Sequence, residues 1–285
     1  MYLLSFDIED WFHIFDNTYY NKPGEWDKLP TSVEKNTNWL LQFLHDHNVK
    51  ATFFTLGWVA DKHPALIKNI AGHGHEVAAH SYYHNKVHDL DPFAFRKDTE
   101  RVIKKLQDIT GKSIDTYRAP GFSLNKTTIW AFEVLHDLGI KVDSSLKSNL
   151  HMGFPGRIPN EPFLLKCDGF TIKEFPTRTF NFLGDHIIYS GSGYFRVWPY
   201  WFVKKRFEAS DYEMAYFHPR DFDNHIHKMF AGNPYLQLRY RIGTNSSRNK
   251  MKSFIKDFDF LTVEKAVKQV NWNEAKVMDL MNGNK

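Results

Sequence analysis

Cysteine is almost absent from this sequence, because Cys167 is the single example among 285 residues. One thiol cannot form an internal disulfide, and it cannot build a zinc site from cysteine ligands. Such sparse use of cysteine fits a reducing compartment.

Long hydrophobic runs are also missing. No apolar stretch approaches the ~18 residues that a membrane-spanning helix needs. The apolar run at the N-terminus, residues 2–6, is too short for a signal peptide and meets acidic residues at once. We therefore expect a cytoplasmic protein without a transmembrane segment.

Neither sign of charge dominates, since 37 basic and 33 acidic residues leave a net charge of +4. No RNA-binding motif or arginine-rich arm accompanies this small excess, so nucleic acid is not expected as a partner. Basic residues gather at 204–206 and 239–256. These clusters are typical of solvated helix faces, and the alternative is a peripheral contact with an anionic glycan or lipid surface.

Repeats, low-complexity tracts and flexible linkers are lacking as well. Because the length suffices for one large domain with a sizeable core, we predict a single catalytic domain over residues 1–285. The sequence gives no indication of the oligomeric state.

Aromatic residues, by contrast, are abundant, with 25 Phe, 13 Tyr and 8 Trp. Most of these rings are expected to form a thick core. The alternative for the remainder is a cleft in which exposed rings stack on the apolar faces of sugars. The segment from Gly191 to Arg196, expected to be a loop, and the aromatics from Trp198 to Trp201 are candidates for that cleft.

Strand-like runs alternate with helical runs along most of the chain. The pattern predicts strands at 2–6, 50–56, 76–79, 116–117, 140–142 and 211–218, and helices at 31–47, 64–72, 92–111, 127–138 and 249–260. Between 148 and 196, frequent Pro and Gly predict loops and short strands. Such alternation indicates an α/β fold, with parallel strands and helices outside them.

Acidic side chains stand at the end of the first predicted strand. Asp7 and Glu9 share one face if the strand stays extended, and Asp10 points to the other face unless the chain turns. A hydrolytic metal site needs one carboxylate as a ligand and a second as general base for water. Either Glu9 or Asp10 remains a candidate ligand.

Two imidazoles follow the third strand. His80 and His84 are four residues apart, so a helical turn capped by Ser81 would place both rings on one face, within reach of one ion. An isolated pair at this spacing is often structural, and the strand in front of it favours a site.

Three further groups follow later strands. Arg118 can neutralise the base carboxylate or orient it through a bidentate contact. Asp143 can pair with Arg118 or hold a histidine ring. His218, at the end of the last strand, is placed to act as general acid. In an α/β barrel the carboxyl ends of the strands meet at one face, so residues far apart in sequence can surround one ion.

These motifs, in this order, resemble those of the polysaccharide deacetylases of carbohydrate esterase family 4, which share the nodulation-type deacetylase homology domain. The family's first motif, an Asp base followed by a metal-binding acid, is similar to Asp7 with Glu9 or Asp10. Its second motif is similar to the segment from His80 to His84. The resemblance runs from residue 3 to about 265.

The family's later motifs are similar to Arg118 with Pro120, to Asp143 and to His218. The nearest likeness is to the bacterial subgroup tied to exopolysaccharide and surface-glycan loci. Two departures stand out: the usual adjacent Asp pair is replaced by Asp-Ile-Glu-Asp, and Ser192 stands where the subgroup tends to have Gly.

The resemblance implies a distorted (β/α) barrel of about seven parallel strands. It also implies removal of the N-acetyl group from a sugar of a surface polysaccharide or its precursor. A divalent metal, with zinc as the first expectation, would be held by His80, His84 and either Glu9 or Asp10. Asp7 would be the base.

Two alternatives stay open at the level of sequence. Another metal-dependent amide hydrolase, acting on a nucleotide-linked sugar, a formamide or a cyclic amide, would use the same groups. A non-catalytic glycan-binding protein would be expected to have lost a ligand or the base, and all candidate groups are present here.

Overall fold

A computed structural model of the chain describes residues 1–15, 22–148, 152, 154, 157–230 and 232–280. Its centre is a sheet in which seven neighbouring strands run parallel. In spatial order these are β10 (Glu213–Phe217), β1 (Tyr2–Ile8), β2 (Thr52–Thr55), β3 (Glu76–Ala79), β4 (Thr116–Tyr117), β5 (Val142–Asp143) and β7 (Thr171–Glu174). The expected α/β class with about seven parallel strands is confirmed.

The remaining strands extend this sheet or lie beside it. β6 (Phe163–Lys166) runs antiparallel to β7 and carries β12 (Val277–Asp279), while β11 (Phe260–Leu261) pairs with the start of β1. β8 (Thr179–Phe182) and β9 (Asp185–Ile188) form a separate hairpin. Among the described residues no pairing joins β7 to β10, so the barrel is open along that seam.

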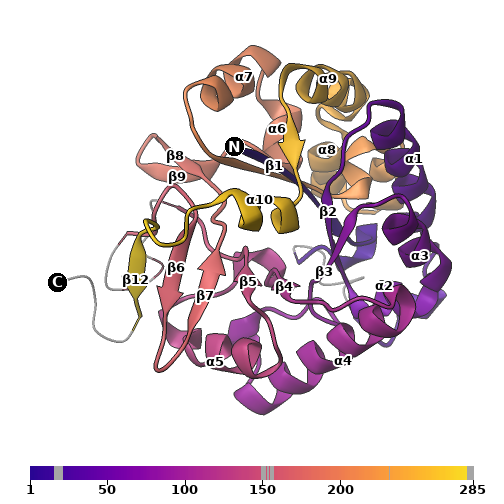
Figure 1. Cartoon of the computed structure of the whole chain (residues 1–285). Helices are drawn as coiled ribbons and strands as arrows, with labels where there is room; N and C mark the ends of the chain where they lie inside the picture. Colours follow the sequence, from indigo (N-terminus) through magenta and orange to yellow (C-terminus); the bar gives the residue numbers. More distant parts are fainter. Residues whose placement is uncertain (16–21, 149–151, 153, 155–156, 231, 281–285) are drawn as a thin grey trace.

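Helices surround the strands, as Figure 1 shows for the first half of the chain. There the helices are α1 (Val33–Asp46), α2 (Gly57–Lys62), α3 (Pro64–Gly72), α4 (Pro92–Thr110) and α5 (Trp130–Asp137). The second half contributes α6 (Ser192–Val197), α7 (Tyr200–Glu208), α8 (Pro234–Arg241), α9 (Thr244–Asp257) and α10 (Val263–Gln269). None of the helices in the described part of the chain is long and apolar enough to cross a membrane.

Local sequence explains the boundaries of the longest helix. The Asp91 side chain accepts a hydrogen bond from the backbone N–H of Ala94, and Pro92 occupies the first turn. At the other end Gly111 adopts a φ of +67°, a left-handed conformation that glycine takes without steric cost. The predicted helix at 92–111 is therefore confirmed almost to the residue.

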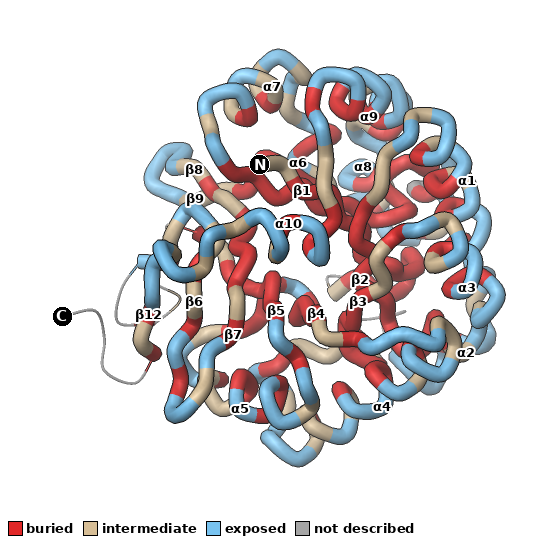
Figure 2. The backbone as a smooth tube through the Cα atoms, in the orientation of Figure 1, coloured by how far each residue is buried: buried red, intermediate tan, exposed pale blue. Residues whose placement is uncertain are grey.

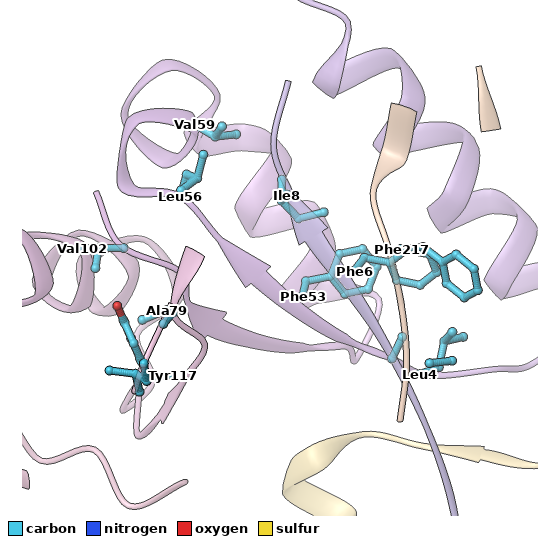
Figure 3. Packing of buried hydrophobic residues seen from close by; sticks show 14 of the residues in the cluster. Leu4, Phe6, Ile8, Phe53, Leu56, Val59, Ala79, Val102, Tyr117 and Phe217 are labelled. Atoms are coloured by element: carbon cyan, nitrogen blue, oxygen red, sulfur yellow. The ribbon is translucent and has the colours of Figure 1, made fainter. Parts of the chain in front are cut away.

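Strand β1 separates two layers of core. Its outer side chains Leu4, Phe6 and Ile8 pack under the helices, where Figure 3 shows the Phe6 ring beside Phe53 and Phe217. Leu3 belongs to a second buried cluster inside the barrel, together with residues of β2, β3, β5, β10 and helix α10. Figure 2 shows that the central strands are buried and that the helices expose their outer faces.

Alternation continues along the inner face of β1, so that Leu3, Ser5, Asp7 and the following Glu9 all point away from the helix layer. Apolar packing at the bottom of the barrel thus gives way to polar chemistry at the carboxyl end of the same strand.

Several sequence-based boundaries were wrong. A helix, α6, begins at Ser192 where a loop was expected, and α9 starts at Thr244 rather than 249. Helix α8 was not predicted because it lacks a clean apolar face: Tyr235 and Leu238 are exposed on it. Helices α2, α7 and α10, each of nine residues or fewer, were also missed.

We predict that Gly191→Ala destabilises the protein. Gly191 forms an isolated bridge with Tyr216, and a Cβ there would lie 2.3 Å from the Tyr216 carbonyl oxygen and 2.4 Å from its ring. Such overpacking costs about 1–3 kcal/mol. Chemical denaturation should show a lower free energy of unfolding for this variant.

Gly193→Ala is the matched control, because a Cβ at Gly193 would meet only the end of the Arg196 side chain, at 3.4 Å. Equal stability of the two variants would contradict the packing argument.

Candidate active site

Six of the predicted site residues stand at carboxyl ends of parallel strands. Asp7 is the second-last residue of β1, and Glu9 follows that strand directly. His80 follows β3, Arg118 follows β4, and His218 follows β10, while Asp143 ends β5. Since these strands are parallel neighbours in one curved sheet, their ends meet on one face of the molecule.

Strand alternation places the acidic side chains of residues 7–10 on two different faces. Asp7 and Glu9 line the same pocket, as the sequence predicts. Asp10 is fully buried and points elsewhere: its carboxylate accepts hydrogen bonds from the Trp11 N–H and from the N–H and hydroxyl of Ser32. With Val33 N–H as a further donor at 3.1 Å, Asp10 caps the start of α1.

The sequence left either Glu9 or Asp10 as the candidate metal-binding carboxylate, and the geometry of the site favours Glu9. Both oxygens of Asp10 are occupied by backbone and hydroxyl donors, whereas Glu9 Oε1 lies 3.0 Å from His84 Nε2 and 3.4 Å from His80 Nε2. Asp10 is therefore a structural cap in this fold, and Glu9 is the carboxylate that meets the imidazoles.

Carbonyl oxygens fix the orientation of both imidazole rings. His80 Nδ1 lies 2.8 Å from the Arg118 carbonyl oxygen, and His84 Nδ1 lies 2.8 Å from that of His13. A carbonyl can only accept, so each Nδ1 carries a proton, and in a neutral ring the Nε2 atom then presents a lone pair. Neither buried Nε2 has a hydrogen-bond partner among the described residues.

The expected helical turn at this pair is wrong. Ser81 and His84 adopt φ values of +67° and +58°, outside the right-handed helical region. The backbone N–H groups of Tyr82 and Tyr83 donate instead to the carboxylate of Asp98. This loop still brings the two rings together, with centroids 5.4 Å apart.

Glu9 stands at the centre of opposite charges. Arg220 donates to Glu9 Oε2 at 2.7 Å, and His218 Nε2 lies 3.5 Å from Oε1. Burial alone would raise the pKa of Glu9, but the charges of His84, Arg220 and His218 lower that pKa well below its ordinary value. Glu9 is therefore ionised across the physiological range.

Arg118 is completely buried inside the barrel and holds Asp7. Its Nη1 donates to Asp7 Oδ1 at 2.8 Å and to the Ser5 hydroxyl at 2.9 Å. The rest of the guanidinium contacts Ser144, through its carbonyl oxygen and its hydroxyl, and stacks over the Phe54 ring at 4.0 Å. The expected bidentate contact with Asp7 is not what the structure shows, because the donors are divided between β1 and Ser144, the residue after β5.

Asp143 lies deeper in the barrel than the sequence suggested. Its carboxylate accepts from the N–H and hydroxyl of Ser145 and shares a hydrogen bond with Glu174. Burial and the Asp143 charge raise the pKa of Glu174 well above its ordinary value, so Glu174 holds the proton of this pair. Among the described residues, the hydrogen bonds of Asp143 involve neither Arg118 nor a histidine, and Asp143 does not line the pocket.

His218 is positioned by the short helix η6 (Pro219–Phe222). Asp221 Oδ2 accepts the His218 backbone N–H at 2.8 Å and lies 3.2 Å from Nδ1 of the ring. Burial and Arg220 would lower the pKa of His218, but Glu9 and Asp221 outweigh them and raise it to about 9. The ring is thus held protonated, and its Nε2 faces Glu9.

Ser192 adds a strained contact. Its φ is +46°, a left-handed conformation that favours glycine, and its hydroxyl lies 3.2 Å from His218 Nδ1. Ser192, which stands where the resembled subgroup tends to have Gly, therefore places a hydroxyl against the His218 ring.

The groups open into a pocket of about 310 Å³. Its lining includes Asp7, Glu9, His84 and His218, with Phe122, Ile188 and Tyr216 as apolar walls. A larger groove of about 580 Å³ adjoins it; the two share Ser192, Tyr194, Tyr216, Arg239 and Tyr240. Trp198 lines the groove and is half-buried.

The donor set fits a divalent metal. Ligand atoms of Glu9, His80 and His84 lie within 4.8 Å of one another, and so do those of Asp7, Glu9 and His218. The Nε2 atoms of the two imidazoles and the carboxylate oxygen of Glu9 would repel one another through their lone pairs unless a cation or a proton lies between them. Two nitrogens and one oxygen form a ligand set that suits zinc and other borderline metals.

Comparison with known families divides the chain into two consecutive matches. Residues 13–142 match the model described as polysaccharide deacetylase. Residues 144–268 match a domain of unknown function, DUF3473. Strand β1 lies just before the first matched region, and its hydrogen-bonded neighbour β10 lies within the second.

Among curated proteins, the peptidoglycan-N-acetylglucosamine deacetylase of Bacillus cereus is 28% identical over 134 residues, which cover 42% of this chain and 48% of that protein. The match thus spans about half the length of that relative.

Solved structures show the same fold. A candidate polysaccharide deacetylase from Mycobacterium smegmatis superposes with a TM-score of 0.66 at 20% identity, covering 100% of this chain and 94% of that one. A mutant of a carbohydrate esterase family 4 pseudoenzyme from Bacillus anthracis gives 0.51 at 12% identity, covering 93% and 66%. Together with the seven parallel strands, these likenesses confirm the predicted barrel-type fold.

Sequence reasoning missed four residues of the site: Arg220, Asp221, Glu174 and Lys147. Arg220 and Asp221 lie two and three residues after His218, so examining the residues that follow His218 would have found them. Glu174 lies in a strand whose side chains alternate, and nothing in that pattern marks it as a carboxylate partner.

We predict that the stability of the metal-free protein falls as pH rises from about 6.5 to 9. The pKa of His218 is about 9 in the folded chain and about 6.5 when unfolded. Its proton therefore stabilises the fold fully below pH 6.5, and that contribution is lost as pH rises through 9. At ~1.4 kcal/mol per unit of pKa, the loss reaches about 3 kcal/mol.

Urea denaturation at several pH values should detect this slope, and His218→Gln should flatten it. Parallel stability curves for the two proteins between pH 6.5 and 9 would show that the ring is not held protonated.

Proposed function

Because residues 13–142 of this chain belong to the polysaccharide deacetylase family, we propose that it removes the acetyl group from an N-acetylated sugar in a glycan or glycan precursor. The observation that carries the proposal is the convergence of Glu9 Oε1 with the Nε2 atoms of His80 and His84, at 3.4 and 3.0 Å, beside Asp7 and His218. The two matched regions would act together as one catalytic unit.

A divalent metal, with zinc as the first expectation, would be held by Glu9, His80 and His84. When bound, such an ion polarises a carbonyl and lowers the pKa of water. The chain's part is to present ligands in fixed orientations, and the carbonyl contacts of both Nδ1 atoms do this for the two rings.

Asp7 is the proposed general base. Its Oδ1 is held by the Arg118 guanidinium at 2.8 Å, which keeps the carboxylate oriented and compensates its charge inside the barrel. Asp7 also lines the pocket, so a water molecule placed there could lose its proton to the other carboxylate oxygen.

His218 is the proposed general acid. Asp221 fixes its Nδ1, so the proton available to the pocket is the one on Nε2. An amine leaving group needs that proton as the C–N bond breaks. Asp143, in contrast, would act through Ser145 and Glu174 as a positioning residue.

The groove beside the pocket is the proposed binding site for further sugars of the glycan. Tyr194 is 45% exposed and lines both cavities, and Trp198 lines the groove. Aromatic faces of this kind suit the apolar faces of pyranose rings.

We expect Asp7→Asn to retain about one metal ion per chain and to lose acetate-releasing activity by ~10²–10⁴-fold, the usual contribution of a general base. Metal content is measured by elemental analysis, and activity by acetate release from N-acetylated oligosaccharides. Asp10→Asn is the matched control: the same change three residues away should lower stability and keep the metal, because Asp10 caps α1.

His80→Ala/His84→Ala completes that experiment and should lose both metal and activity. A wild-type chain that takes up no zinc after incubation would refute the mechanism and favour a non-catalytic glycan-binding protein. Full activity of Asp7→Asn would assign the base to another carboxylate.

Removing the exposed ring of Tyr194 from the groove should weaken the binding of longer oligosaccharides. Tyr194→Ala is expected to raise KM about 10-fold for a tetrasaccharide and less for a monosaccharide, since a stacked ring contributes ~1 kcal/mol or more. Trp201→Ala is the control, because Trp201 is 68% exposed but lines neither cavity. An equal KM change for both substrates would place Tyr194 at the reacting sugar instead.

A further inference from the structure

Lys147 is a cation of the pocket that the proposed mechanism does not use. It lies between β5 and β6 in an extended segment bridged to Thr177. Its neighbours Leu146 and Ser148 are fully buried on the other side of that segment. Alternation therefore turns the partly buried Lys147 side chain the opposite way, toward the pocket that contains Asp7, Glu9 and His218.

The other charged groups around the reacting centre have partners. Asp7 pairs with Arg118 at 2.8 Å, Glu9 with Arg220 at 2.7 Å, and His218 with Asp221 at 3.2 Å. The Lys147 ammonium has no hydrogen bond or ion pair in the described parts of the chain. Burial lowers its pKa, and no carboxylate acts on it in the other direction.

A partly buried ammonium without a counter-ion weakens the folded state, and such groups are kept where a ligand completes them. The surroundings of Lys147 fit a sugar that carries a charge. Phe122, Ile188 and Tyr216 form an apolar cluster on the same pocket, which suits a pyranose face. Arg239 adds a second cation where the pocket meets the groove.

We infer that Lys147 binds an oxyanion of the glycan, a carboxylate or a phosphate ester on the reacting sugar or its neighbour. This inference rests on the proposed function, since it names the substrate class of the same site: an anionic N-acetylated saccharide rather than a neutral one. Lysine suits this role because its ammonium is a point charge that can bind either a planar carboxylate or a tetrahedral phosphate.

The test is binding to the metal-free protein, in which turnover cannot occur. Calorimetry compares neutral chitobiose with two charged probes: a disaccharide of N-acetylglucosamine and glucuronic acid, and N-acetylglucosamine 1-phosphate. We expect the wild type to bind at least one charged probe about 10- to 100-fold more tightly than chitobiose, the usual range for a hydrogen bond to a charged group. The probe that gains more identifies the carboxylate or the phosphate as the natural anion.

Lys147→Met should abolish this preference, and Lys147→Arg should restore most of it. Lys141→Met is the matched control: it removes the same charge from the amino-terminal side of β5, where Lys141 is exposed and 3.5 Å from Asp115. Equal Kd values for all probes in the wild type, or a preference that survives Lys147→Met, would overturn the inference.

Thermal unfolding gives a readout that a structural role would not produce. Removing an unpaired, partly buried ammonium should leave Tm unchanged or raise it, whereas a lower Tm in Lys147→Met would mean that the ammonium has a partner within the fold and would refute the inference. Acetate release is measured separately. Acetate release without a preference for charged probes would support the proposed function and reject the anion site. A Lys147-dependent preference without acetate release would support the anion site and reject the proposed function.

Discussion

The buried guanidinium of Arg118 is the contact on which the rest of the site depends. One side chain joins β1 through Ser5 and Asp7, β2 through the Phe54 ring, and the end of β5 through Ser144. Its backbone carbonyl also orients His80. An arginine can be fully buried in a barrel only if its donors are satisfied and its charge is compensated. The arrangement of the strand ends and the orientation of the Asp7 carboxylate are therefore set by the same requirement.

Charge in this barrel is organised as a column rather than as a surface patch. Apolar residues fill the bottom around Phe54, Arg118 lies above them, and carboxylates and imidazoles follow toward the pocket. Each buried acid along the column is neutralised in a different way: Asp7 by a guanidinium, Glu9 by Arg220 and imidazoles, and Asp143 by sharing the proton of Glu174. Because the interior cannot stabilise a lone charge, the orientation and charge of these side chains are fixed by the fold itself.

The sequence was a good guide wherever a local pattern decides the structure. Alternation in β1 placed Asp7 and Glu9 on one face, and Pro and Gly marked the ends of α4. The sequence was a poor guide where residues far away in the chain determine the local structure or the role of a side chain. The spacing of His80 and His84 suggested a helix, but Asp98, on another element, captures the intervening N–H groups. The role of Asp10 depends on Ser32, and that of Asp143 on Glu174, and neither pairing has a local signature.

Strand β1 has neighbours from very different parts of the chain. It pairs with β2, about 50 residues later, and with β10, which lies about 210 residues later. At ~5–20 residues per second, a ribosome would need roughly 10–40 s to make the chain between β1 and β10. During that interval one edge of an apolar strand, and the acids at its end, lack their final partners. Such long-range pairing slows folding, and until β10 has been made the free edge of β1 is open to pairing with other chains.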